Sequence, residues 1–254
     1  MEEKELFKRI LGRTRKAVED YDMIREGDRV CVGVSGGKDS LALLCSMARL
    51  AKFYPKKFEV CAVTVDLGFP DTDFTKVAEL CESLGVPFKK VDTYIAEILF
   101  DIRKESNPCA LCANLRRGAL NNAAIDLGCT TVALAHHHED VIETAMLALL
   151  YEGRYYCFQP DTWLERAKLH VIRPFIYIEE SMIKKYSKMA ELPVVFNPCP
   201  MDKTSKRAEV KDLIARLSKE NHDLRSNLFG AIQRGLWPEP AKGPGEKTRG
   251  GQNE

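Results

Sequence analysis

The chain of 254 residues lacks a long hydrophobic run and lacks an excess of charge of either sign. The apolar stretch at residues 144–151 is far shorter than the roughly 20 residues that a membrane-spanning helix needs. Residues 1–5 are mostly charged and contain no apolar segment of the kind found in secretory signals. These absences predict a cytoplasmic protein with no membrane partner.

Strong basicity is also missing, because 38 Lys and Arg residues oppose 37 Asp and Glu residues and leave a net charge of +1. A uniformly basic nucleic-acid-binding domain is therefore excluded. The charge is nevertheless uneven. Residues 203–234 carry eight basic and four acidic side chains, residues 103–117 carry four and one, and residues 59–82 carry one and six. The first two segments, with the basic side chains at residues 8–16, predict a local surface that RNA phosphates could follow.

Disulfide pairing is a further expected absence. The chain has nine cysteines, an odd number, and no sign of secretion, so we expect reduced thiols. Six cysteines stand alone in mostly apolar patterns, where a free cysteine behaves as a small hydrophobic side chain. We assign no chemistry to these six, which are Cys31, Cys45, Cys61, Cys81, Cys129 and Cys157.

Brief β-branched runs alternate with helical spacing along the chain, which is the pattern of parallel strands joined by crossover helices. With 45% hydrophobic residues, this pattern predicts an α/β fold with a doubly wound, mostly parallel sheet and helices at both ends of the chain. We predict strands at residues 29–34, 58–65, 86–91, 130–135 and 170–173. We predict helices at residues 3–21, 41–53, 73–84, 113–127, 139–150, 179–190 and 205–219.

These elements divide the chain into four parts. Residues 1–25 form an N-terminal helix, residues 26–200 the main domain, and residues 201–238 a basic helical segment. Residues 239–254 contain four Gly, two Pro and no large apolar side chain, so they cannot offset the entropy cost of ordering. We predict a disordered tail there.

The sharpest local signal is Val-Gly-Val-Ser-Gly-Gly-Lys-Asp-Ser at residues 32–40, where a buried strand meets an amphipathic helix through a glycine-rich turn. Such a turn aims backbone N–H groups and the positive helix end at an anion. It is not a Walker loop, because Asp39 follows Lys38 where that motif requires Ser or Thr. The alternative is an ordinary strand-to-helix connection in which Ser35 or Ser40 caps the helix.

A second polar cluster, His136 to Asp140, follows the fourth predicted strand. In a doubly wound sheet the first and fourth strands commonly flank the ligand crevice, so the cluster is expected opposite the glycine-rich turn. Its carboxylates could hold Mg²⁺ together with water and phosphate oxygens. The alternative is that Glu139 and Asp140 only complement the helix dipole and the histidines are solvated.

Three cysteines differ from the other six. Cys109 and Cys112 form a Cys-x-x-Cys pair in a predicted loop entering a helix, and Cys199 lies between two prolines. Three thiolates without a fourth ligand suggest an open site rather than a closed structural zinc site. A [4Fe–4S] cluster on three cysteines, a zinc site completed by His136 or His137, and a redox dithiol all remain open at this point.

The Ser-Gly-Gly-Lys-Asp-Ser turn resembles the PP-loop of the N-type ATP pyrophosphatases, which split ATP into AMP and pyrophosphate. Together with residues 109–118, the histidine cluster and Cys199, in the same order, the chain resembles the tRNA 2-thiocytidine synthetase family over residues 30–217. This resemblance implies a Rossmann-like fold and an enzyme that adenylates the C2 carbonyl of an anticodon-loop cytidine and then inserts sulfur. It also implies a tRNA partner and a persulfide sulfur donor such as a cysteine desulfurase, and it allows a homodimer.

Residue by residue, the resemblance implies an ATP site with Mg²⁺ and a [4Fe–4S] cluster. Cys109, Cys112 and Cys199 would bind the cluster and act in catalysis with Asp140. The side chains and amides expected to hold ATP and its phosphates are Ser35, Gly36, Gly37, Lys38, Asp39, Ser40, His136 and Arg116. The alternative for Arg116 and its neighbour Arg117 is a solvated helix face.

The chain departs from the family pattern at two positions. Glu139 stands where the family's His-His-x-Asp-Asp segment has its first Asp. Met201 and Asp202 follow Pro200 where the family often has a further cysteine, which removes a spare thiol for relaying sulfur. Two other functions therefore stay open: a relative that thiolates or desulfurises another tRNA base, and a nucleotide-binding iron–sulfur sensor without turnover. Tyr155, Tyr156 and Trp237 could stack an unpaired base, and the alternative is that they pack in the protein, which is the commoner role of an aromatic side chain.

Overall fold

The computed structural model describes residues 2–103, 108–200 and 206–241. It contains one mixed sheet of six strands in the order β3-β2-β1-β4-β6-β5. Neighbouring strands are parallel except at the edge, where β5 runs antiparallel to β6. The strands are β1 (Asp28–Gly33), β2 (Phe58–Asp66), β3 (Phe88–Asp92), β4 (Thr131–Ala133), β5 (Asp161–Leu164) and β6 (Leu169–Ile172). The predicted α/β class and parallel sheet are confirmed.

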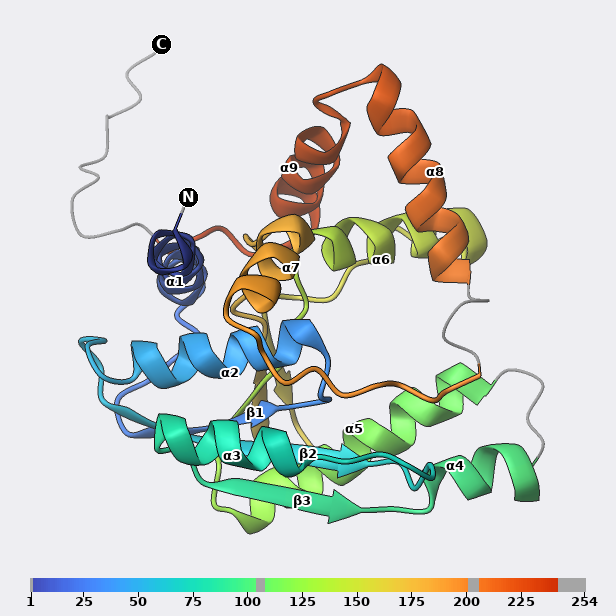
Figure 1. The fold of residues 1–254 in the computed structure, drawn as a ribbon. Helices are drawn as coiled ribbons and strands as arrows, with labels where there is room; N and C mark the ends of the chain where they lie inside the picture. The colour runs from blue at the N-terminus through green and yellow to red at the C-terminus, as the bar shows by residue number, and fades with distance from the viewer. Residues whose placement is uncertain (1, 104–107, 201–205, 242–254) are drawn as a thin grey trace.

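The described helices surround this sheet (Figure 1). They are α1 (Glu3–Asp20), α2 (Lys38–Leu50), α3 (Thr75–Leu84), α4 (Ile95–Glu97), the π-helical turn η1 (Ile98–Ile102), α5 (Pro108–Asp126), α6 (His138–Tyr151), α7 (Glu180–Met189), α8 (Lys206–Glu220) and α9 (Leu224–Leu236). Among the described residues, no helix is both long and apolar enough to cross a lipid bilayer.

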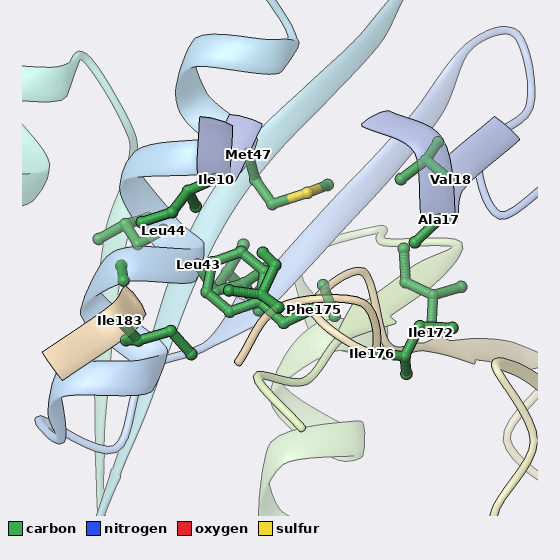
Figure 2. Packing of buried hydrophobic residues seen from close by; sticks show 14 of the residues in the cluster. Ile10, Ala17, Val18, Leu43, Leu44, Met47, Ile172, Phe175, Ile176 and Ile183 are labelled. Atoms are coloured by element: carbon green, nitrogen blue, oxygen red, sulfur yellow. The ribbon is translucent and has the colours of Figure 1, made fainter. Parts of the chain in front are cut away.

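The larger hydrophobic core lies between one face of the sheet and helices α1, α2 and α7. Ile10 of α1, Leu43 of α2, Ile183 of α7 and the connecting residue Phe175 are fully buried members of this core (Figure 2). A smaller core covers the opposite face, where Ala123 and Ala124 of α5 pack against the strands. Both faces are therefore covered, which explains why the central strands read as continuous apolar runs.

Several elements differ from the sequence prediction. Strand β5 and helix α9 were not predicted, and α2 and α5 both begin earlier than expected, at Lys38 and Pro108. The earlier start of α5 places Cys109 and Cys112 inside the helix instead of in a loop before it. Proline is well tolerated at the first helical position, because its missing N–H would lack a helical partner there anyway.

The N-terminal helix is part of the main body of the protein. Leu6, Ile10 and Val18 of α1 are fully buried, and Arg13 donates to the carbonyl oxygen of Tyr177. The basic segment predicted at residues 201–238 contains α8 and α9, while its residues 201–205 and most of the predicted tail, 242–254, lie outside the described residues. The division into four parts stays a prediction.

Candidate functional site

The candidate site lies at the carboxyl ends of β1 and β4, which are adjacent in the sheet. The chain builds outward from β1 to β2 and β3 on one side, and from β1 to β4 and β6 on the other. The strand order therefore reverses between β1 and β4, and such a reversal opens a crevice at the strand ends. The glycine-rich turn follows β1 and the histidine cluster follows β4, as the sequence predicts.

The turn after β1 is shaped for an anion. Gly36 has φ +81°, a left-handed conformation that favours glycine. Ser40 is used inside the turn, because its hydroxyl accepts a hydrogen bond from the Ser35 N–H (3.1 Å) and donates to the Gly37 carbonyl (2.9 Å). No side chain among the described residues caps the start of α2. The amides of its first turn are therefore available to a phosphate group.

Lys38 and Asp39 carry the charges of the turn. Lys38 Nζ lies 3.0 Å from Asp39 Oδ2 and 3.1 Å from Glu180 Oε1. Burial works against a charge on Lys38, but these two carboxylates outweigh it and raise the pKa of the lysine. The other oxygen of Asp39, Oδ1, is buried without a hydrogen-bond partner among the described residues. An unsatisfied carboxylate oxygen beside a phosphate site is the kind of ligand that Mg²⁺ takes.

The histidine cluster meets the phosphate loop through His137. Its Nε2 lies 3.9 Å from Asp39 Oδ1 and 3.5 Å from Asp140 Oδ2, and its Nδ1 lies 3.3 Å from Glu139 Oε2. Burial favours a neutral ring, yet the hydrogen bond to Glu139 and the charges of Asp140 and Asp39 raise the pKa of His137. No local pattern distinguishes His137 from the histidines on either side of it.

His136, the histidine expected to bind nucleotide, faces the protein interior. Its ring stacks on Phe158 with centroids 4.8 Å apart. Burial and the nearby positive charge of Arg173 lower the pKa of His136 to about 4, so the ring is neutral at pH 7. It is therefore available as a hydrogen-bonding group and not as a cation.

Asp140 caps the start of α6, which is close to the structural alternative predicted from the sequence. Its Oδ2 accepts a hydrogen bond from the backbone N–H of His137 (3.0 Å), which closes a capping box at the start of α6. Its Oδ1 accepts a hydrogen bond from Arg207 Nη1 of α8 (3.1 Å). Asp39, with one oxygen unsatisfied, is thus better placed than Asp140 to offer a ligand to Mg²⁺.

Cys109 and Cys112 lie at the start of α5, and Cys199 is near enough to Cys112 to affect its pKa. Cys109 is exposed, whereas Cys112 and Cys199 are half-buried. Burial raises the pKa of Cys112, the charges of Cys199 and Cys109 act in the same direction, and a hydrogen bond from Arg116 opposes them. Cys112 is therefore within electrostatic reach of both other thiols, and Arg116 opposes part of the upward shift in the pKa of Cys112.

The donor set fits an iron–sulfur cluster better than a single ion. In the described part of the chain, no three Cys, His, Asp or Glu side chains meet closely enough to hold one metal ion. A cluster contains several iron atoms, each taking its own cysteine, so its ligands lie farther apart than those of one ion. Cys112 within electrostatic reach of both Cys109 and Cys199 matches that requirement.

Cys199 reaches this position because its segment follows the phosphate loop. Figure 1 shows the segment after α7 running past the start of α2 toward the start of α5. Val195 N–H donates to the Gly36 carbonyl (2.9 Å), and the Cys199 N–H donates to Asn197 Oδ1 (3.2 Å). One stretch of chain thus links the phosphate loop to the cysteines.

A groove of about 840 Å³ opens beside the loop, which is within the range for a nucleotide-sized ligand. Its lining comes from the start of α2, from α7 and from the segment after α7. The lining residues are Gly37, Lys38, Asp39, Lys184, Ser187, Lys188, Glu191, Leu192, Val194, Val195 and Asn197.

Two residues of the site were missed by sequence reasoning. Glu180 Oε2 lies 2.7 Å from Lys211 Nζ of α8, while its Oε1 pairs with Lys38. Burial alone would raise the pKa of Glu180, but the hydrogen bonds to Lys211 and Lys38 outweigh burial and lower it to about 2. The available signal was an acidic pair at the start of a predicted helix, a pattern that usually only complements the helix dipole.

The aromatic candidates for base stacking divide into two groups. Tyr155 and Tyr156 are exposed, at 58% and 48%. Trp237 is instead buried, donates from Nε1 to the Phe158 carbonyl (2.8 Å) and packs edge-on against Tyr21 and Phe229. The suggestion that Trp237 stacks a base is wrong, because its ring is part of the core.

Comparison with known proteins places these features in one family. A model of the PP-loop domain matches residues 7–217. The curated tRNA-cytidine(32) 2-sulfurtransferase of Pelobacter propionicus is 38% identical over 235 residues, which cover 91% of this chain and 87% of that protein. The proteins of the same name from Anaeromyxobacter dehalogenans and Burkholderia cenocepacia are 36% and 37% identical, covering 89% and 92% of this chain and 79% and 71% of their own lengths.

A solved structure has the same architecture. The U34-tRNA thiolase NcsA from Methanococcus maripaludis, determined with its [4Fe-4S] cluster, superimposes with a TM-score of 0.75 and covers 91% of this chain and 79% of its own. The two sequences are 24% identical. This likeness establishes the fold.

Proposed function

The chain belongs to the PP-loop domain family and to its tRNA-cytidine(32) 2-sulfurtransferase branch, and from this premise we propose that it is an ATP-dependent tRNA thiolase. The proposed product is 2-thiocytidine at position 32 of the anticodon loop, the position in the names of the relatives. ATP, Mg²⁺ and a [4Fe–4S] cluster are the proposed cofactors, and a persulfide protein such as a cysteine desulfurase is the proposed sulfur source.

In the first step the C2 oxygen of cytidine attacks the α-phosphorus of ATP and pyrophosphate leaves. The amides at the start of α2 and the Lys38 ammonium hold the departing pyrophosphate, and the unsatisfied oxygen of Asp39 offers a ligand for Mg²⁺. The C2 oxygen then leaves with AMP as sulfide-level sulfur takes its place, and a thiol reductant, which ends as a disulfide, supplies the two electrons that bring persulfide sulfur to that level. This sequence turns a poor leaving group into a good one before the carbon–oxygen bond breaks.

Cys109, Cys112 and Cys199 would hold the cluster, and the charge of Arg116 would offset part of the burial effect that raises the pKa of Cys112. When bound, a cluster held by three cysteines supplies one iron coordination position that no protein side chain fills. The chain's own residues set where that position lies, because Cys199 is delivered by the segment that pairs with the phosphate loop at Gly36.

The proposal rests on the structural link between the phosphate loop and the cysteines. The Val195–Gly36 backbone hydrogen bond ties the phosphate loop to the segment ending at Cys199, and Cys199 is in electrostatic contact with Cys112. ATP-dependent activation and sulfur chemistry would then act on one base in one crevice. Neither a separate nucleotide site nor a separate metal site explains this arrangement as well.

The direct test compares the nucleosides of tRNA with and without the gene, and of tRNA treated with anaerobically purified protein. We expect the wild-type protein to contain iron, to release AMP only when tRNA is present, and to form 2-thiocytidine. The Cys109→Ala variant should lose iron and product, whereas Cys45→Ala, a change at a buried cysteine in α2, should keep both. Iron-free wild-type protein, with no loss of activity in Cys109→Ala, would refute the proposal.

The same measurements separate the two other functions. A different thiolated or desulfurised nucleoside in the tRNA comparison would identify a relative with another target base. Iron and ATP binding without AMP release for any tRNA would identify a sensor.

A further inference from the structure

Glu180 bridges two lysines from different parts of the fold. Its Oε1 lies 3.1 Å from Lys38 Nζ of the phosphate loop, and its Oε2 lies 2.7 Å from Lys211 Nζ of α8. The backbone N–H of Glu180 donates to Glu139 Oε2 (2.8 Å), which fixes the start of α7 against α6. The carboxylate therefore has a rigid base and two cationic partners, one in the phosphate site and one outside it.

The charged groups next to Glu180 also have other partners. Lys38 also pairs with Asp39 (3.0 Å), and Glu139 also faces His137 (3.3 Å) and Arg225 of α9 (3.6 Å). Lys211 is about half exposed and forms an ion pair with Glu180. Glu180 therefore gives the direct ion-pair link from Lys38 to α8, while a longer route runs from Asp39 through His137 and Asp140 to Arg207 of α8.

A bound phosphate changes the partners of this carboxylate. Phosphate oxygens form strong charge-assisted hydrogen bonds with a lysine at the end of a phosphate loop. When Lys38 turns to them, Glu180 loses one cation and gains a nearby anion, so Lys211 becomes its main counter-charge. Coulomb interactions between charges a few ångströms apart are strong enough in a partly buried site to shift a helix contact.

We propose that Glu180 is a positioning residue that couples occupancy of the phosphate loop to the placement of α8. When a nucleotide's phosphates engage Lys38, the carboxylate of Glu180 binds Lys211 alone and holds α8 against the start of α7. This proposal rests on the proposed function, because it takes ATP as the ligand of the loop. Helix α8 carries Lys206, Arg207, Lys211, Arg216 and Lys219.

The coupling has a consequence for RNA. If the basic face of α8 contacts tRNA phosphates, a steadier α8 lowers the entropy cost of binding tRNA, so ATP and tRNA strengthen each other's binding. Thermodynamic linkage requires the effect to be equal in both directions. The protein would then activate ATP mainly when tRNA is in place.

The first test needs no tRNA. Hydrogen exchange of the α8 amides is followed by mass spectrometry in the iron-loaded protein, with and without an ATP analogue that has a methylene bridge between the α- and β-phosphates. We expect slower exchange in α8 when the analogue is bound to the wild-type protein, and no such change in Glu180→Gln. Each variant is compared with itself, so a general loss of stability cancels.

Glu179→Gln is the matched control. Glu179 is the neighbouring residue, but it pairs with Arg13 of α1 (3.1 Å). This variant should keep the nucleotide-dependent protection of α8. The proposal is overturned if wild-type α8 shows no response to the bound analogue, or if Glu180→Gln responds as the wild type does.

Nucleotide affinity separates coupling from a purely structural role. Glu180→Gln should bind the analogue at least as tightly as wild type, because a carboxylate near the phosphates has been removed. Lys211→Met should bind it more weakly, because that carboxylate is left uncompensated, and the double variant should recover. Weaker binding in Glu180→Gln, with no recovery in the double variant, would indicate that Glu180 only holds the fold together.

The tRNA measurement completes the test. In wild type we expect the analogue to lower the Kd for tRNA by about fivefold or more, the lower end of typical allosteric coupling, and in Glu180→Gln by a factor near one. A chain that protects α8 on binding nucleotide but never thiolates tRNA would refute the proposed function and leave this inference standing. A chain that thiolates tRNA without any response in α8 would do the reverse.

Discussion

Replacing Gly36 by alanine tests whether the phosphate loop and the segment that ends at Cys199 are built against each other. A Cβ at this position would lie 2.8 Å from Val195 Cβ, 2.9 Å from Val195 Cγ2 and 3.3 Å from Phe74 Cε1. Val195 cannot easily retreat, because its N–H is hydrogen-bonded to the Gly36 carbonyl. The backbone of Gly36 is also left-handed, with φ +81°.

The cost has two parts. An L-residue in the left-handed region costs roughly 1–2 kcal/mol, and overpacking against a fixed side chain costs roughly 1–3 kcal/mol more. Gly85 isolates the first part, because it has φ +70° at the end of α3 and nothing within 4 Å of an added Cβ. At roughly 2–4 °C per kcal/mol for a domain of this size, Gly85→Ala should lower Tm by about 2–8 °C and Gly36→Ala by a further 2–12 °C or so.

The assay is thermal unfolding followed by circular dichroism, with iron content measured on the same samples. Gly36→Ala should also lower the iron content, since moving Val195 moves the segment that carries Cys199, whereas Gly85→Ala should leave iron unchanged. Equal shifts in Tm for the two variants, with equal iron content, would refute the close packing of loop and segment.

Three other predictions concern thiols, charge and aromatic packing. In iron-free native protein a maleimide should label Cys109, Cys112 and Cys199 rapidly and the six buried cysteines only after denaturation. Peptide mass spectrometry identifies the labelled cysteines, and rapid labelling of a buried cysteine would contradict the burial pattern. The pKa of Glu180 is lowered to about 2 from an ordinary value of 4.5, so its stabilising effect is full above about pH 4.5 and is lost as the pH falls toward 2. The Tm difference between wild type and Glu180→Gln should therefore be largest near pH 7 and shrink below pH 4.5, and a difference that grows on acidification would refute this sign. Trp237→Ala should lower the free energy of unfolding, measured by urea titration, by roughly 3–5 kcal/mol. Its tRNA affinity should change little at a temperature where the variant is folded. A large loss of tRNA affinity with little loss of stability would instead indicate that Trp237 contacts RNA.

The sequence predicted the centre of the sheet well and its edge poorly. Strand β1 and the turn before α2 combine a β-branched run, glycines and a helical stripe, so several local signals agree there. Strand β5 is short, partly exposed and antiparallel, and its four residues form no distinctive pattern. Helix α9 contains Gly230 and Gly235, which weaken the helical signal, and it is stabilised by burial of Phe229 and Ile232 instead.

The candidate site was predictable where one motif carried one chemistry. The phosphate loop and the Cys-x-x-Cys pair were recognised from short patterns, and the family assignment they suggested is confirmed. The ion pairs of Glu180 were not predictable, because its two lysines come from helices distant in the sequence and only tertiary packing brings them together. Likewise, nothing local distinguishes His136, which faces Phe158, from His137, which faces Asp39.

The net charge of +1 does not describe the local electrostatics of the protein, because it averages over parts of the chain that tertiary packing places far apart or side by side. The acidic side chains in residues 59–82 belong to β2, α3 and the connection between them, whereas most of the basic excess in residues 203–234 is carried by α8 and α9, which pack on α6. Within the site opposite charges are interleaved, since Lys38 contacts both Asp39 and Glu180 and Glu180 also contacts Lys211. A triphosphate would break this balance, and so would an RNA phosphate near α8. A protein that is neutral overall can therefore respond electrostatically to both ligands at one crevice.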